Sequence, residues 1–198
     1  MSRSGRRTSA VLPPKARKAV LTAHVIASVA WIGLSVCLLV LGLTGLLHPD
    51  PQVSRAAYIA LGVVVTPGQP ISGLALVSGI ALSLGTKWGL LRHWWVVVSL
   101  VLTAVMTALV QLSLAPLMRG AAAKVLAAAP EVPAADAVGG DAVSIVVAPA
   151  VAITALSFVA AINVYKPWGR TSRSGPANPA ATRLGASPGS PATSRSRR

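Results

Sequence analysis

The sequence predicts an all-α fold: a bundle of four helices that spans a membrane, followed by a disordered basic tail. Of the 198 residues, 54% are hydrophobic and only 11% are charged, and the mean hydropathy is +0.68. These values are high for a soluble globular domain. The charged residues also cluster between long apolar runs instead of spreading along the chain, which is typical of a multi-span helical membrane protein.

The first predicted span covers residues 19–47. It follows a polar, basic N-terminal segment, residues 1–18, in which Pro13 and Pro14 interrupt any continuous helix. As a helix the apolar run reaches roughly 40 Å, against about 30 Å for the hydrocarbon core of a bilayer. It is too long for the apolar core of a signal peptide, so we expect a retained transmembrane helix.

The second predicted span covers residues 56–85 and contains the sequence TPGQP near its middle. Pro67 and Pro70 each remove a backbone donor, so the helix should kink or break locally at this point. Neither half is long enough to cross a bilayer alone. The pattern therefore favours one bent span over two short helices.

The remaining predicted spans cover residues 93–118 and 142–165, which completes a transmembrane domain over residues 19–168. The alanine-rich segment between these two spans is expected to form a short surface helix. After residue 168 the chain is rich in Ser, Pro, Gly, Ala and Arg. Residues 169–198 cannot bury a core and are predicted to be disordered.

The distribution of charge predicts the orientation in the membrane. With four spans, the N-terminal segment, the loop between spans two and three, and the C-terminal segment share one side, and they carry six, two and seven basic residues. The other side has three basic residues and all four acids: Arg55, Arg119, Lys124, Asp50, Glu131, Asp136 and Asp141. The positive-inside rule then places both termini in the cytoplasm and the protein in the cell membrane.

The formal net charge of +14 bears on the partners of the chain. The basic residues flank apolar runs or lie in the tails, and no folded nucleic-acid-binding module is visible. We therefore expect the lipid bilayer, with anionic headgroups bound by the basic tails, and no nucleic acid. A homo-oligomer is left open.

One face of the first span carries the polar residues of that helix. At roughly 100° per residue, Ser28, Trp31 and Ser35 fall within about 40° of His24. Polar groups in lipid need partners, so this face is predicted to turn toward the other helices. His24 is then either a hydrogen-bonded packing histidine or a ligand to a cofactor.

His93 begins the third span, and spans one and three run in the same direction, so His24 and His93 are expected at similar depth. A haem b or metal site that uses both histidines is one interpretation, although no cofactor is required by the pattern. The alternative is that His93 is an ordinary polar residue at the membrane interface.

A polar stripe follows the third span, with residues spaced four apart: Ser99, Thr103, Thr107 and Gln111. Hydrogen bonding between helices is the interpretation we favour, and a polar pathway through the membrane is the alternative. None of the four acids falls inside a predicted span, which weighs against an ion-coupled pump.

Two stretches carry a resemblance to known proteins: LTAHVIASVAWIG, and GTKWGLLRHWWVVV. Over residues 15–168 the chain resembles actinobacterial four-helix integral membrane proteins of unknown function. More distantly it is similar to proteins of the copper-resistance protein D type and to haem-binding membrane protoporphyrinogen oxidases. His24 matches their first-helix histidine. The oxidases also have a lysine in a later helix, and this lysine would be expected near Ser99 in the present sequence. Serine is not a base, so the resemblance implies the fold rather than the oxidase reaction.

The leading functional interpretation is a non-enzymatic membrane protein, because no nucleophile elbow, phosphate loop, HExxH motif or carboxylate pair is present in the sequence. The alternative is a haem- or metal-binding membrane protein that uses His24, with or without His93. A small-solute transporter or channel component is a weaker alternative.

Overall fold

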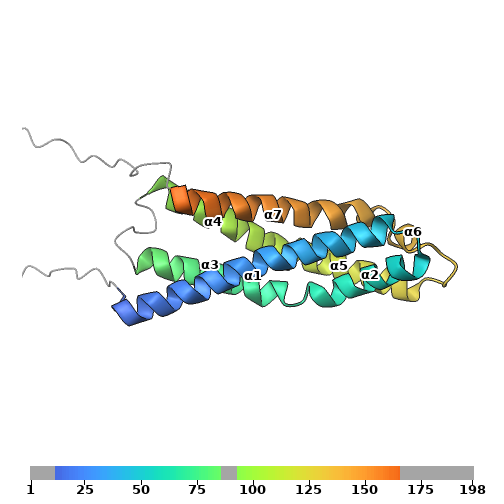
Figure 1. Cartoon of the computed structure of the whole chain (residues 1–198), viewed down its shortest axis with the longest axis horizontal. Coiled ribbons are helices and arrows are strands. Elements are labelled where there is room, and N and C mark those ends of the chain that lie inside the picture. Colours follow the sequence, from blue (N-terminus) through green and yellow to red (C-terminus); the bar gives the residue numbers. More distant parts are fainter. Residues whose placement is uncertain (1–11, 86–92, 166–198) are drawn as a thin grey trace, which may run out of the picture.

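The computed structural model of the chain describes residues 12–85 and 93–165, and every regular element in these two ranges is a helix (Figure 1). The all-α fold class is thereby confirmed. The predicted disordered tail and most of the basic N-terminal segment lie outside the described residues.

Helix α1, Pro14–Leu47, is the longest helix without interruption. It begins before the predicted start at residue 19, because proline is well tolerated in the first turn, where its missing N–H would have no partner. Its C-terminal end leads into His48 in an extended conformation. Asp50 then caps the next helix by accepting a hydrogen bond of 2.8 Å from the backbone N–H of Gln52.

The second apolar run forms two helices, α2 (Pro51–Val64) and α3 (Gly68–Leu84), which are bent by 40° at the break between them. The break covers residues 65–67, next to the two prolines that predict it. In the described residues, three helices are long and apolar enough to cross a membrane, or four if the bent pair is one span. This composition is that of a membrane protein.

The third run is helix α4 (Trp94–Leu109), which continues through a π-helical turn, η1 (Val110–Leu114), into helix α5 (Ala115–Ala127). It passes the predicted end at residue 118 because the following residues are mostly alanine, the best helix former. Pro116 lacks a backbone N–H, which accounts for the local change to π geometry just before it.

A short helix, α6 (Ala134–Val138), ends at Gly139, whose φ of 67° is favourable only for glycine. The last helix, α7, is Asp141–Tyr165 and includes Pro149. The predicted short surface helix between residues 119 and 141 is therefore split between the end of α5 and α6.

The long helices lie side by side and alternate in direction (Figure 1). Helix α1 packs on α3, α2 and α7, α2 packs on α5, and α4 packs on α3 and α7. The start of α1, the end of α3, the start of α4 and the end of α7 meet at one end of the bundle, which we call the N-terminal end (left in Figure 1). There the backbone N–H of Leu12 donates to the carbonyl of Gly85 at 3.2 Å.

The opposite end, which we call the α6 end, is held together by charged side chains. Nη2 of Arg55 donates to the carbonyls of Val125 and Ala128 at 2.5 and 2.6 Å, so it caps the C-terminal end of α5. Nζ of Lys124 lies 2.6 Å from a carboxylate oxygen of Asp141 and joins α5 to α7. These contacts fix the loops that connect the helices at the α6 end.

Candidate functional site: a cavity at the N-terminal end

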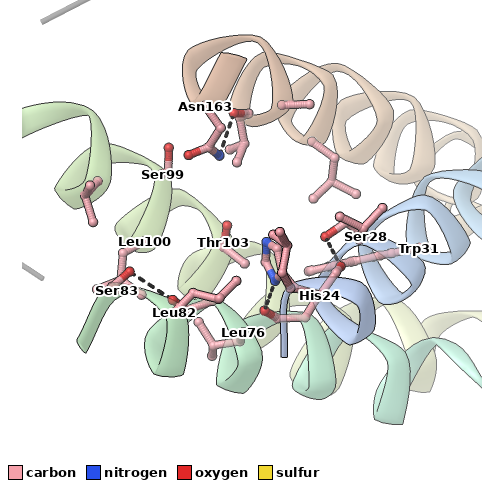
Figure 2. A pocket seen from close by; sticks show the side chains of 18 of the residues that line it. His24, Ser28, Trp31, Leu76, Leu82, Ser83, Ser99, Leu100, Thr103 and Asn163 are labelled. Carbon is pink, nitrogen blue, oxygen red and sulfur yellow. Dashed lines mark hydrogen bonds between the residues drawn. The ribbon is translucent and has the colours of Figure 1, made fainter. Parts of the chain in front are cut away.

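A cavity of about 940 Å³ lies between α1, α3, α4 and α7 near the N-terminal end of the bundle (Figure 2). Most of its wall is aliphatic. The polar and aromatic side chains that line it are Arg17, His24, Ser28, Trp31, Ser83, Trp95, Ser99, Thr103 and Asn163. An apolar cavity with a few polar groups is the usual form of a small-molecule site.

His24 projects from α1 into this cavity and is held by α3. Its Nδ1 lies 3.0 Å from the carbonyl oxygen of Ala75 and 3.0 Å from Oγ of Ser78. A carbonyl can only accept, so in the neutral imidazole Nδ1 is assigned the hydrogen and Nε2 keeps a lone pair. Oγ of Ser78 donates to the carbonyl of Leu74 at 2.6 Å, which leaves its lone pairs to accept from Nδ1.

The second ring nitrogen of His24 faces into the cavity, away from the carbonyl to which the ring is bonded (Figure 2). Among residues 12–85 and 93–165, Nε2 makes no hydrogen bond. The ring is therefore fixed through one nitrogen and presents the other to whatever enters the cavity.

Glycine at position 79 allows α3 to approach the imidazole. A β-carbon added at Gly79 would lie 3.2 Å from Cε1 of His24, a tight contact that the ring could accommodate only by moving a few tenths of an ångström. Small residues at helix contacts allow this kind of close approach in membrane bundles. Gly79 thereby sets the distance at which Ala75 and Ser78 reach the ring.

The predicted polar face of α1 is divided by the structure. His24, Ser28 and Trp31 line the cavity, whereas Ser35 does not. The hydroxyl groups of Ser28 and Ser35 donate to carbonyls of their own helix, those of His24 at 2.8 Å and Trp31 at 2.9 Å. These hydroxyl hydrogens are thus used within α1, whereas the imidazole of His24 makes its hydrogen bonds to α3.

The polar stripe of the third span is divided in a similar way. Ser99 and Thr103 line the cavity, and Oγ of Ser99 is a buried atom with no hydrogen-bond partner in the described structure. Thr107 donates to the carbonyl of Ser72 at 3.4 Å. Gln111 lies at the break of the bent helix, further from the N-terminal end, and does not line the cavity.

Gln111 pairs with Gln69 of α3 through two hydrogen bonds. Nε2 of Gln69 donates to Oε1 of Gln111 at 3.0 Å, and Nε2 of Gln111 donates to the carbonyl of Gln69 at 2.9 Å. Arg119 also donates to Oε1 of Gln69. This cluster satisfies polar groups beside the break between α2 and α3, and it is separate from the cavity.

The structure does not bring His93 to the lining of the cavity. His93 is buried at the start of α4, where its ring centroid lies 6.2 Å from that of Trp95, which does line the cavity. The prediction that His24 and His93 together hold a haem or metal stays a prediction.

Several lining residues were missed by sequence reasoning. Arg17 lies seven residues before His24 and therefore on the same face of α1, so helical periodicity could have found it. Asn163 is the one amide inside the last apolar run, and it lines the cavity while its Nδ2 donates to the carbonyl of Val159 at 2.9 Å. The role of Ala75 has no signal in sequence because a backbone carbonyl is present at every position.

Metal ligation by protein groups alone finds little support in the described ranges, where no group of three or more His, Cys, Asp or Glu side chains could hold an ion. Comparisons of the chain with protein-family models, with curated proteins and with solved structures found no match.

Proposed function

We propose that the chain is a four-span protein of the cell membrane, with both termini in the cytoplasm, that binds haem b in the cavity through Nε2 of His24. The orientation of the imidazole is the observation that carries this proposal. Its Nδ1 is bonded to the carbonyl of Ala75 at 3.0 Å, and Nε2 faces the cavity.

This donor arrangement fits an axial ligand. A metal-binding histidine usually donates its other ring N–H to a carbonyl or carboxylate, which fixes the tautomer and the ring orientation. Histidine is also a common axial ligand of haem iron. The resemblance of the first helix to haem-binding membrane proteins at His24 agrees with this choice of ligand.

The size and lining of the cavity also suit the porphyrin macrocycle of haem b. A volume of about 940 Å³ is at the upper end of the range for small-molecule sites, roughly 300–1,000 Å³. Aliphatic and aromatic side chains, among them Trp31 and Trp95, suit a large apolar macrocycle. Bound haem b would supply a redox-active iron centre within the membrane.

The role we propose for this chain is binding, and no residue is assigned to catalysis. His24 binds, and α3 orients it through Ala75 and Ser78. A single protein ligand is proposed, because His93 does not line the cavity.

An absorption spectrum of the full-length protein, purified in detergent from cells supplied with haem precursor, tests the proposal. We expect a Soret band in the wild-type protein and its loss in His24→Leu. His48→Leu is the matched control, because His48 is an exposed histidine beyond the other end of α1. It should keep the band unchanged.

The result for His93→Ala decides whether one or two histidines are used. An unchanged Soret band is expected for a single ligand, and a shifted band would indicate the pair. A colourless wild-type protein from haem-replete cells would contradict haem binding, provided that thermal unfolding shows the protein is folded.

A further inference from the structure

Arg17 is a cation at the edge of the cavity with no acidic side chain near it. It lies on α1 seven residues before His24, about 10 Å along the helix and nearly on the same face. Arg17, Lys15 and Lys18 are all exposed, but of the three only Arg17 lines the cavity.

The acidic side chains of the protein cannot pair with Arg17. The chain has four in total, and all of them lie near the α6 end, in the α1–α2 connection, between α5 and α7, or at the first residue of α7: Asp50, Glu131, Asp136 and Asp141. Nζ of Lys124 pairs with Asp141 at that end. The guanidinium at the cavity is therefore left without a carboxylate from the chain's side chains.

The polar groups of the cavity are thus separated along its length. A cationic group lies toward the N-terminal end of the bundle, and a lone pair on Nε2 of His24 lies two turns further along α1. A ligand that interacts with both Arg17 and His24 has an anionic group at one edge. At its centre it has a metal ion, or another group that accepts the lone pair of Nε2. Arginine binds carboxylates strongly because its planar fork can form two parallel hydrogen bonds.

We propose that Arg17 holds the carboxylate of the ligand and so determines its orientation, with the charged edge toward the N-terminal end of the bundle and the apolar body along α3, α4 and α7. This inference rests on the proposed function, since it concerns the same ligand. Haem b carries two carboxylates at one edge of the macrocycle and has the required form.

Titration of the full-length protein with haemin and with its dimethyl ester, followed by the Soret band, tests this role. The ester keeps the iron and the macrocycle but has no carboxylate. We expect Arg17→Gln to bind haemin about tenfold more weakly than wild type, the loss expected from one charge-assisted hydrogen bond. The ester should bind wild type and Arg17→Gln equally well.

Lys18→Gln is the matched control, because it removes the same charge at the next position in the sequence, from a side chain that does not line the cavity. It should bind haemin as wild type does, which separates a specific contact from the general attraction of a basic surface. Equal haemin affinities for Arg17→Gln and Lys18→Gln would overturn the assignment to Arg17. If neither haemin nor the ester gives a Soret band with wild type, haem binding fails, and the assignment fails with it.

Discussion

At the scale of single residues, the hydrogen bond from Nδ1 of His24 decides which ring nitrogen is available to a ligand. The acceptor is the carbonyl of Ala75, at 3.0 Å, and its position depends on how closely α3 lies against α1. Gly79 is the residue that permits this distance, since any β-carbon there would meet the imidazole. The chemistry of one histidine is therefore set by a residue that makes no polar contact with it.

Gly79→Ala should displace the ring of His24. The new methyl group would lie 3.2 Å from Cε1, and the ring is held in place by Ala75 and Ser78. Overpacking of this kind costs about 1–3 kcal/mol. We expect a lower free energy of unfolding, measured in detergent, and weaker binding of haemin, measured by titration.

Gly73→Ala is the control for that substitution, because Gly73 lies on the same helix and a β-carbon there meets nothing within 4 Å. It should leave haemin binding unchanged and either keep or raise the stability, since alanine favours a helix more than glycine does, by up to about 1 kcal/mol. Equal effects of the two substitutions would mean that contact with His24 is not the cause.

Helical periodicity was sufficient to place His24, Ser28 and Trp31 on one face, because the angle between residues of one helix is fixed. It could not identify the partner of His24, because the register of α3 against α1 depends on packing between helices. For the same reason, the sequence showed the stripe from Ser99 to Gln111 but not that only its first two members line the cavity.

At the scale of whole helices, proline positions predicted the bend between α2 and α3 correctly, because a missing N–H interrupts the helix wherever it occurs. The extension of the third run to Ala127 was not anticipated. Hydropathy indicates how much of the chain prefers lipid, but it does not indicate where a helix ends. A helix continues beyond the apolar run when the next residues favour helix, as the alanines of α5 do.

The contact between α2 and α5 depends on the absence of a side chain at Gly62. A β-carbon added there would lie 2.8 Å from Cβ of Ala122. Both atoms are fixed to a helix backbone, so neither can move by changing rotamer. Gly62→Ala should therefore lower the free energy of unfolding by about 1–3 kcal/mol, as measured by denaturation in mixed micelles.

Removing the opposing methyl group should relieve the clash. In an Ala122→Gly background, we expect Gly62→Ala to cost less than about 0.5 kcal/mol, so the two changes are strongly non-additive. Gly120→Ala on α5, where a β-carbon meets nothing within 4 Å, is the control and should be neutral. Simple additivity of Gly62→Ala and Ala122→Gly would show that α2 and α5 do not pack as described.

At the scale of the whole molecule, the two ends of the bundle differ in charge. The α6 end carries all four acidic residues, together with Arg55 and Lys124, whose polar contacts are made to α5, α6 and α7. The N-terminal end begins with Lys15, Arg17 and Lys18, each exposed. The cavity lies near this basic end, so a ligand with an anionic edge would meet favourable charge on entering it.

This asymmetry leads to a prediction about orientation. Excess basic residues remain on the cytoplasmic side of membrane proteins, so the N-terminal end should face the cytoplasm and the α6 end should face outward. Single cysteines in a Cys37→Ala background can test this by reaction of intact cells with a maleimide that does not cross membranes. Gln52→Cys and Ala129→Cys, both at exposed positions of the α6 end, should react.

Lys15→Cys and Lys87→Cys should react only after the cells are permeabilised. Lys87 is informative because it follows the bent pair: if α2 and α3 cross the membrane as one span, position 87 lies on the cytoplasmic side with position 15. If the pair instead enters and leaves on the outer side, Lys87→Cys would react in intact cells. Reaction of Lys15→Cys in intact cells would reverse the whole orientation. The cavity and Arg17 would then face the outside, and a ligand would have to enter from there.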